Sequence, residues 1–362
     1  MINPNHYCVI MAGGIGSRFW PMSQSSFPKQ FHDVLGTGRT LIQQTFDRFE
    51  KLCLPENIFV VTHEDYKHLV KEQLPALSDA QILCEPYRRN TAPCVAYAAY
   101  KIHAINPNAT MVVAPSDHLI MKEDVFVDTV SVAMQQAEGD NCLVTLGIKP
   151  SRPDTGYGYI QFVDDENATN QVRKVKTFTE KPDRELAEQF IDSGDFYWNS
   201  GIFIWTTSSI ITEFENHLPE MAKQFEEGNA VYNTAQEDKF IKGTYETCTN
   251  ISIDFGVMEK AAKVFVVLSD FGWSDLGTWG SLYTHLNHDK QGNGVTGKKV
   301  RLYESSDNVV HVPKDKLVVL HGLKDYIVVD ANDILLVCKK DDEQKIKQFV
   351  MDIKHEFGDG IA

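Results

Sequence analysis

Apolar residues in the first 150 positions form short runs, separated by longer segments in which apolar positions recur at helical spacing. The short runs predict strands at Tyr7–Met11, Ile58–Thr62, Gln81–Glu85, Met111–Pro115 and Leu143–Ile148. The segments between them predict helices near Leu41–Leu52, Glu64–Leu74, Thr91–Ile105 and Asp124–Ala137. This alternation is typical of an α/β, Rossmann-like fold with a mixed, mostly parallel sheet and helices on both faces. Ligands of such sheets bind beyond the carboxyl ends of the strands, so the loops there are the first candidates for chemistry.

The middle of the chain, residues 150–285, mixes the two kinds of pattern. Strands are predicted at Tyr157–Val163, Val172–Thr179, Gly201–Trp205 and Val264–Leu268, and helices at Arg184–Ser193 and Ser208–Glu227. We interpret this segment as an insertion over the same sheet and not as a separate domain. Residues 1–288 are therefore expected to form one domain.

The composition changes near Asp289, where Gln291–Gly297 is rich in turn residues. Short strand-like runs follow at Asn308–Val312, Leu317–Leu320, Tyr326–Val329 and Ile334–Cys338. Their regular recurrence predicts a small C-terminal β-rich, β-helix-like domain over residues 289–362. The chain then ends in an amphipathic helix with Ile346, Phe349, Val350 and Ile353 on one face. That helix is expected either to cover the β-domain or to contact another subunit.

The charge balance excludes some classes of function. A formal net charge of −15 over 362 residues argues against a general nucleic-acid binder, which needs a basic face. No apolar run reaches the roughly 20 residues that span a bilayer, and Tyr7–Ala12 is too short for a signal-peptide core. The charge and the short apolar runs thus predict no nucleic-acid or membrane partner. The seven cysteines are odd in number and contain no CxxC pair, which favours reduced thiols in a cytoplasmic protein.

The strongest local signal is a glycine-rich loop directly after the first predicted strand. Gly13, Gly14 and Gly16 fall within four positions, and Arg18 and Lys29 follow them. Such a loop either makes a tight turn or presents backbone N–H groups to an anion, with the two cations adding charge that an acidic protein otherwise lacks. The pattern fits neither the dinucleotide-binding G-x-G-x-x-G, because Phe19 replaces the third glycine, nor the P-loop G-K-[ST].

The run from Ala12 through Pro28-Lys29-Gln30-Phe31 resembles the signature of the sugar-1-phosphate nucleotidylyltransferases, in the version of the branch that transfers GMP to mannose 1-phosphate. The resemblance implies the nucleotidyltransferase, GT-A-like fold for residues 1–288. It also implies that GTP and α-D-mannose 1-phosphate give GDP-mannose and pyrophosphate by metal-assisted in-line attack on the α-phosphorus. In that family the arginine and the lysine hold and polarise the triphosphate, and we carry these roles to Arg18 and Lys29.

Two aspartates stand in loops where ligands of the sheet should collect. Asp117 lies in Ala114–His118, and Asp275 lies in Phe271–Trp279. Either could simply cap a helix or form a turn. Mg²⁺ prefers oxygen ligands and can be held by one or two carboxylates together with phosphate oxygens. In the family these two aspartates bind the catalytic Mg²⁺, so Asp117 and Asp275 are the predicted metal ligands, whereas His118 is interpreted as positional.

The segment Cys84–Pro93 follows a strand and opens a helix, so Asn90 or Thr91 could serve only as its cap. The alternative concerns guanine, whose N1–H and N2–H₂ donors could both be accepted by the carboxylate of Glu85. The string E-P-x-x-R-N-T-A-P resembles the guanylyltransferase branch, and whether Arg89 or Asn90 touches the base stays open. The predicted nucleotide-binding residues are Ala12, Gly13, Gly14, Gly16, Ser17, Glu85, Arg89, Asn90 and Thr91.

Further motifs resemble the family's sugar-phosphate pocket, although each alone could be an ordinary turn or helix start. They place carboxylates and an amide for sugar hydroxyls, a lysine for the phosphate, and glycines for close approach. The predicted sugar-phosphate residues are Tyr157, Gly158, Glu180, Lys181, Asn199, Gly201 and Asp254. The predicted catalytic set is Arg18, Lys29, Asp117, Lys181 and Asp275.

Two alternatives remain: the same chemistry on fucose, glucose or heptose 1-phosphate, and a non-catalytic sugar-nucleotide sensor. Family members often dimerise, so a homodimer is predicted. Longer relatives carry a further isomerase domain, and phosphomannose isomerase activity is not expected here.

Overall fold

The computed structural model describes residues 2–163 and 171–358, which divide into two compact units. The sheet unit consists of residues 1–13, 45–116 and 120–273, and the β-helix unit of residues 14–44, 117–119 and 274–362. The helices are α1 Leu41–Phe49, α2 Lys67–Gln73, α3 Thr91–Ile105, α4 Glu123–Asp140, α5 Arg184–Ser193, α6 Thr207–His217, α7 Pro219–Glu226, α8 Glu237–Thr247, α9 Trp279–Tyr283 and α10 Ile346–Phe357. Shorter helical turns are η1 Ser17–Phe19, η2 Lys29–Phe31, η3 Pro55–Asn57, η4 Glu64–Tyr66, η5 Asp79–Gln81, η6 Asp254–Met258 and η7 Lys340–Lys345.

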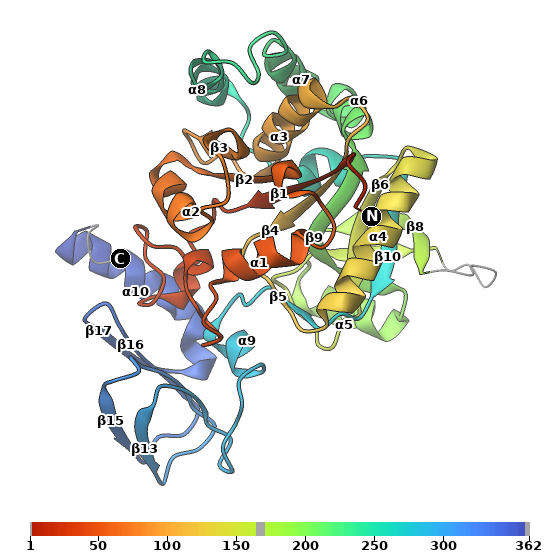
Figure 1. Ribbon diagram of the computed structural model, residues 1–362. Helices are drawn as coiled ribbons and strands as arrows, with labels where there is room; N and C mark the ends of the chain where they lie inside the picture. The colour runs from red at the N-terminus through yellow and green to blue at the C-terminus, as the bar shows by residue number, and fades with distance from the viewer. Residues whose placement is uncertain (1, 164–170, 359–362) are drawn as a thin grey trace. The chain divides into compact units, whose positions relative to one another are not determined.

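The sheet unit is built on a nine-stranded sheet in the order β3-β2-β1-β4-β9-β6-β10-β8-β7 (Figure 1). Its strands are β1 His6–Met11, β2 Ile58–His63, β3 Ile82–Glu85, β4 Thr110–Pro115, β6 Leu143–Ile148, β7 Tyr159–Phe162, β8 Val172–Thr179, β9 Phe196–Thr206 and β10 Val264–Ser269. The ladders β1–β2, β2–β3, β1–β4 and β6–β10 are parallel, whereas β9 and β8 pair antiparallel with their neighbours. The mixed, mostly parallel sheet is therefore confirmed.

Apolar residues alternate along these strands and bury one face of the sheet against helices α3, α6 and α7. Met111 and Val113 of β4 belong to this cluster, together with Phe203 and Trp205 of β9. Helix α3 is buried almost all round from Ala92 to Ile102, as its small and apolar residues predict. Helix α4 packs along β4, β6, β9 and β10.

The middle of the chain differs from its prediction in two ways. It does not lie over the sheet but completes it, because β9 is inserted between β4 and β6. The single helix predicted over Ser208–Glu227 is two helices, α6 and α7, since Pro219 has no N–H for a helix interior and instead begins α7.

The β-helix unit contains short parallel ladders that follow one another along the chain. Its strands are β12 Gly294–Thr296, β13 Lys299–Tyr303, β14 Val309–His311, β15 Leu317–His321, β16 Tyr326–Ala331 and β17 Ile334–Lys339. Strands β12, β14 and β16 pair in parallel, as do β13 and β15, and β17 turns back antiparallel to β16. This is the predicted β-helix-like arrangement, and the predicted C-terminal helix is α10. Short strands β5 Leu119–Ile120 and β11 Trp273–Ser274 stand where the chain passes between units.

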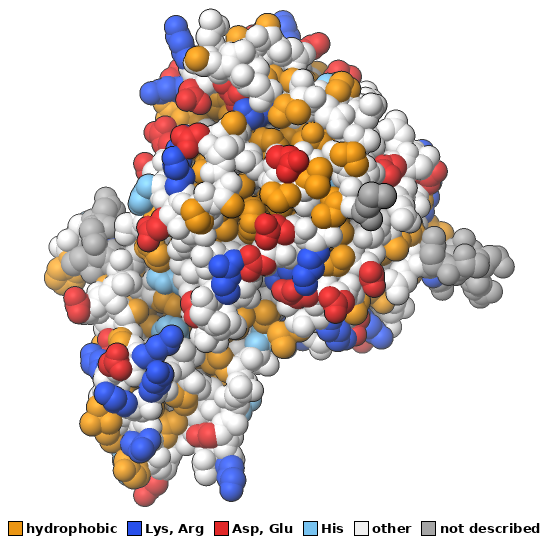
Figure 2. All heavy atoms as spheres, in the orientation of Figure 1, with side chains coloured by type: hydrophobic (Ala, Val, Ile, Leu, Met, Phe, Trp, Pro, Cys, Tyr) orange, Lys and Arg blue, Asp and Glu red, His pale blue; other side chains and the backbone are white. Residues whose placement is uncertain are grey.

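Side chains on the visible face of the molecule are mixed in type (Figure 2). Basic and apolar side chains lie together where Figure 1 labels the strands of the β-helix unit. Exposed apolar residues of that unit include Tyr303, Leu317, Val319, Leu335 and Val337. Among the described residues, no helix combines the length and apolar character that crossing a membrane requires.

Candidate active site

The glycine loop begins directly after β1, and its shape depends on one of its glycines. Gly16 has φ +68°, in the left-handed region, and a Cβ at this position would lie 2.6 Å from Cβ of Lys29. Two carbonyl groups of the loop accept hydrogen bonds within the β-helix unit, that of Ile15 from Ser23 Oγ at 2.5 Å and that of Gly14 from Gln30 Nε2 at 3.0 Å. The loop is therefore held against the segment that carries Lys29.

Replacement of Gly16 by alanine is expected to lower the free energy of unfolding by about 2 kcal/mol, because the left-handed backbone and the close contact both penalise a side chain. Gly14→Ala is the matched control, since Gly14 has no positive φ and a Cβ added there would meet no atom within 4 Å. Urea unfolding of both variants measures this. Equal stability of the two variants would contradict the assigned role of Gly16.

Lys29 joins the two aspartate segments. Its ammonium group lies 2.7 Å from Asp117 Oδ2 and donates to the backbone oxygens of Asp275 at 2.9 Å and Leu276 at 3.0 Å. These three acceptors account for all three of its N–H donors. The buried Lys29 therefore fixes Asp117 beside the Asp275 loop.

The predicted catalytic residues of the β-helix unit line one pocket of about 280 Å³. The residues that line it are Gly16, Ser17, Arg18, Phe19, Lys29, Asp117, His118, Asp275, Gly277 and Lys347. Burial alone would raise the pKa of Asp117, but Lys29 and then His118 outweigh it and hold that pKa below its usual value. Asp275 Oδ1 accepts a hydrogen bond from the Gly277 N–H at 3.0 Å. The pocket thus holds two carboxylates with cations around them.

The carboxylates of Asp117 and Asp275 are the type of ligand that Mg²⁺ prefers. Mg²⁺ needs only one or two protein carboxylates when phosphate oxygens complete its coordination shell. No group of three or more His, Cys, Asp or Glu side chains suited to a metal occurs in residues 2–163 and 171–358. Arg18 adds a guanidinium group to the pocket. Its buried Nε has no hydrogen-bond partner among the residues that the structure describes. Lys347, which also lines the pocket, was not predicted, and only its place on the amphipathic helix near the chain end could have suggested it.

Glu85 ends β3 in the sheet unit and is buried. Its Oε1 accepts a hydrogen bond from the Tyr245 hydroxyl at 3.0 Å, and its Oε2 would lie 3.4 Å from a Cβ on Gly13. Burial raises the pKa of Glu85 to about 7, against the opposing effects of Tyr245 and Arg88. Tyr245 on α8 was not predicted, because α8 itself was not.

The neighbours of Glu85 in the sequence are engaged with backbone groups. Arg89 donates from Nε to the Tyr245 carbonyl at 3.1 Å and from Nη2 to the Glu246 carbonyl at 3.0 Å. Asn90 caps α3 by accepting from the Thr91 N–H, and Thr91 Oγ1 accepts from the Ile253 N–H at 2.9 Å. Ala12, the other predicted nucleotide-binding residue of this unit, donates its N–H to the Val61 carbonyl at 2.8 Å.

Most of the predicted sugar-phosphate residues come together in the sheet unit. Asn199 Nδ2 donates to Asp254 Oδ1 at 2.9 Å, and a Cβ on Gly158 would lie 2.5 Å from Glu180 Oε2. Burial, and then the nearby Glu180, raise the pKa of Asp254 to about 6. Lys181 is exposed and pairs with Glu180. These groups form a polar cluster with acceptors for hydroxyl groups.

Aromatic rings stand beside this cluster. The Tyr157 ring meets Trp198 and Trp273 edge-on, with centroids 5.0 and 5.2 Å apart. The Arg152 guanidinium lies 5.5 Å from the Trp198 ring. Trp273 and Arg152 were not predicted as site residues. Gly201, with φ +70°, completes the predicted set in β9.

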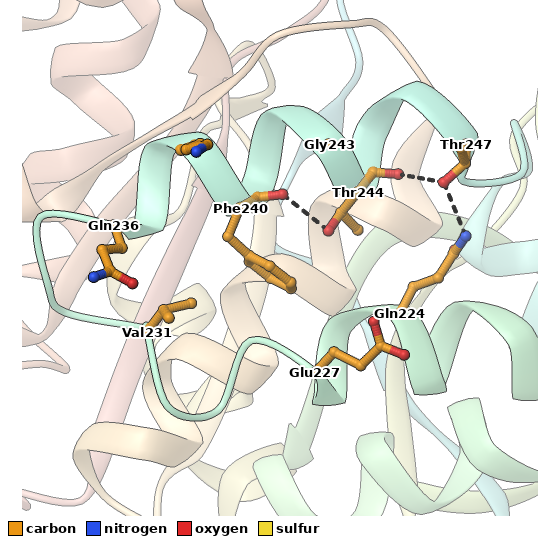
Figure 3. A pocket seen from close by; sticks show the side chains of 9 residues that line it. Gln224, Glu227, Val231, Gln236, Phe240, Gly243, Thr244 and Thr247 are labelled. Atoms are coloured by element: carbon orange, nitrogen blue, oxygen red, sulfur yellow. Dashed lines mark hydrogen bonds between the residues drawn. The ribbon is translucent and has the colours of Figure 1, made fainter.

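A cavity of about 710 Å³ between α7 and α8 carries none of the predicted residues (Figure 3). Gln224 Nε2 donates to Thr247 Oγ1 at 3.1 Å across it, and Thr244 Oγ1 donates to the Phe240 carbonyl. The polar groups named here are thus engaged with side chains or backbone of α7 and α8, and the predicted site residues lie elsewhere.

Comparison with known proteins gives consistent matches over nearly the whole chain. Residues 7–292 match the nucleotidyl transferase family model, and residues 297–353 match the MannoseP isomerase/GMP-like beta-helix domain. The mannose-1-phosphate guanylyltransferase of Escherichia coli is 36% identical, over 94% of this chain and 74% of its own length. The alginate biosynthesis protein AlgA of Pseudomonas aeruginosa is 37% identical, over 95% of this chain and 71% of its own length. A crystal structure described as mannose-1-phosphate geranyltransferase, from Thermus thermophilus, has a TM-score of 0.86 and 30% identity over 97% of this chain and 99% of that one.

Proposed function

Because the chain belongs to the nucleotidyl transferase family, we propose that it joins GTP and α-D-mannose 1-phosphate into GDP-mannose and releases pyrophosphate. The observation that carries the proposal is the pocket in which Asp117 and Asp275 stand with Arg18 and Lys29. Two carboxylates with cationic side chains around them in one small pocket suit a nucleoside triphosphate with its metal.

The reaction needs charge and alignment more than proton transfer. The attacking group is a phosphate oxygen of mannose 1-phosphate, which is already anionic near neutral pH, so no side chain must remove a proton. That oxygen bonds to the α-phosphorus, the bond from the α-phosphorus to the bridging oxygen breaks, and its electron pair leaves with pyrophosphate. Arg18 supports the triphosphate, and Lys29 keeps Asp117 in place and ionised. His118 needs no role as a base.

Asp117 and Asp275 are the residues that would hold Mg²⁺. Their oxygen donors match its preference, and Lys29 and His118 keep the Asp117 carboxylate ionised even in a partly buried place. When bound, the ion would neutralise charge on the phosphate oxygens.

Glu85 is proposed to bind the Watson–Crick edge of guanine, accepting from N1–H and N2–H₂ with its two oxygens. Support comes from its buried carboxylate, whose Tyr245 bond fixes one oxygen. Gly13, beside Oε2, allows close approach. Asn90 and Thr91 hold the start of α3, and Arg89 holds α8, so these three act on the nucleotide site through the backbone.

This assignment predicts a dependence of GTP use on pH. Only ionised Glu85 can accept from both guanine donors, and its pKa is raised to about 7. Below that pH, kcat/KM for GTP is expected to fall by about tenfold per pH unit, and above it to level off. The titration of GTP itself is common to all variants, so the Glu85→Gln profile serves as the reference. A wild-type profile that follows this reference would contradict the role of Glu85.

Mannose 1-phosphate is assigned to Tyr157, Gly158, Glu180, Lys181, Asn199, Gly201 and Asp254. Glu180, Asn199 and Asp254 offer acceptors to sugar hydroxyls, and the exposed Lys181 is proposed for the phosphate. We further propose a catalytic domain over residues 1–288 and a β-domain over 289–362, in a cytoplasmic protein with reduced cysteines. All seven cysteines are free.

A homodimer is proposed through the exposed apolar side chains of the β-helix unit. Leu317 and Val319 pair in register with Lys299 and Arg301 on one face of the β13–β15 ladder, and all four are exposed. Sedimentation velocity of the wild type and of Leu317→Asp would measure the oligomeric state, and the variant is expected to be more monomeric. A monomeric wild type would contradict the proposed dimer.

The function is tested by pyrophosphate release from GTP, ATP, UTP and dTTP, each with mannose, fucose, glucose or a heptose 1-phosphate. GTP with mannose 1-phosphate is expected to be the preferred pair. Preference for another sugar 1-phosphate would replace the sugar assignment, and binding of GDP-mannose without any turnover would identify a sensor.

A further inference from the structure

Helix α10 packs against the helical turn that carries Arg18. Ile346 and Val350, one helical turn apart, are buried in a cluster with Phe19 and Trp20. This contact joins two segments of the β-helix unit that are far apart in the sequence, the turn η1 and helix α10. The turn before α10 is also fixed, since Glu343 Oε2 accepts from the Gly280 N–H at 2.8 Å. The beginning of α10 thus has a defined place in the β-helix unit.

This packing directs Lys347 into the pocket that holds Asp117 and Asp275. Arg18 and Lys347 both line this pocket of about 280 Å³, and repulsion from Arg18, together with burial, lowers the pKa of Lys347. Neither of them makes an ion pair with any residue in 2–163 or 171–358. In a chain of net charge −15, two neighbouring unpaired cations are an unusual local arrangement.

Lys29, the third cation of the pocket, differs from Arg18 and Lys347 because its donors are already used. All three donors of Lys29 are used by Asp117 and by the backbone of Asp275 and Leu276. Arg18 and Lys347 therefore have the donors available to a ligand. Two like charges that are held together repel each other, and an anion of higher charge that binds both offsets this repulsion. A diphosphate is such an anion.

We propose that Lys347 is a diphosphate-binding residue, which with Arg18 binds the β- and γ-phosphates of GTP and then the departing pyrophosphate. This rests on the proposed function and adds to it that the C-terminal helix supplies charge to the reaction. As the bond from the α-phosphorus to the bridging oxygen breaks, negative charge develops on that oxygen, and the two cations stabilise it.

The test uses Lys347→Gln, which removes the charge and keeps the length, and Lys347→Arg, which keeps the charge. Lys345→Gln is the matched control, because Lys345 pairs with Asp342 at 2.8 Å and does not line the pocket. For Lys347→Gln, kcat/KM for GTP is expected to fall about 30-fold, and the KM for pyrophosphate in the reverse reaction to rise about tenfold. The KM for mannose 1-phosphate should not change, and Lys347→Arg should recover most of the loss.

Calorimetric titration of each protein with magnesium pyrophosphate makes the test independent of turnover. The wild type and Lys345→Gln are expected to bind it about tenfold more tightly than Lys347→Gln, with unchanged unfolding midpoints. This result would stand even if guanylyl transfer were not the reaction. Equal affinity of wild type and Lys347→Gln, or no binding by either, would overturn the role of Lys347. So would a loss in Lys347→Gln that appears only in the KM for mannose 1-phosphate.

Discussion

Asp275→Ala is expected to lower kcat by roughly 10³-fold while the protein stays folded and still binds GDP-mannose. The side chain contributes charge to the pocket, whereas the contact to Lys29 comes from the backbone oxygen of Asp275 and survives the substitution. Asp117→Asn should have a similar effect on kcat, with an added loss of the ion pair to Lys29. Initial rates of pyrophosphate release at saturating GTP measure both.

Asp315→Ala controls for the loss of a carboxylate from the same unit, since Asp315 is exposed and lies outside the pocket. It should turn over like the wild type. If Asp275→Ala kept more than about a tenth of wild-type kcat, the assignment of Asp275 to the reacting phosphate would be wrong.

Glu85→Gln is expected to lower kcat/KM for GTP by roughly 10²-fold or more. The amide keeps one acceptor but turns an N–H₂ donor toward the donors of guanine, and a buried mismatch of this kind is costly. The same substitution should reduce the preference for GTP over UTP and dTTP, whose ring N–H is flanked by carbonyls. Competition among the nucleotides measures the change.

Tyr245→Phe provides the companion variant. It leaves the carboxylate but removes the hydroxyl that lowers the pKa of Glu85, so the rise of kcat/KM with pH should move to higher pH. An unchanged nucleotide preference in Glu85→Gln would show that another group reads the base.

Local sequence pointed to the parts of the site that follow strands. Glu85 ends β3 and Asp117 follows β4, where ligands of such sheets bind, but a helix cap or a turn stayed open for Asp117, and the motifs that resemble the family were needed to select both residues. Gly16 was selected with its loop, although it alone of Gly13, Gly14 and Gly16 takes positive φ. The β-helix-like unit was also predicted, because its coils recur at a regular spacing.

Residues placed by tertiary packing could not be predicted in this way. Helix α8 has few apolar positions and an internal glycine, so its pattern is weak, and Tyr245 reaches Glu85 only through the fold. Lys347 looks like any lysine on an amphipathic helix until the packing of Ile346 and Val350 fixes its direction. The ion pair between Lys29 and Asp117 likewise joins segments that lie far apart in the sequence, so no local pattern could predict it.

In the proposed reaction, a phosphate oxygen of the sugar attacks the α-phosphorus of GTP. This attack is tested most directly by incubating the protein and mannose 1-phosphate with GTP radiolabelled at either the α- or the γ-phosphate. The α label is expected entirely in GDP-mannose and the γ label entirely in pyrophosphate. Recovery of the γ label in a sugar phosphate or as free phosphate would contradict the account.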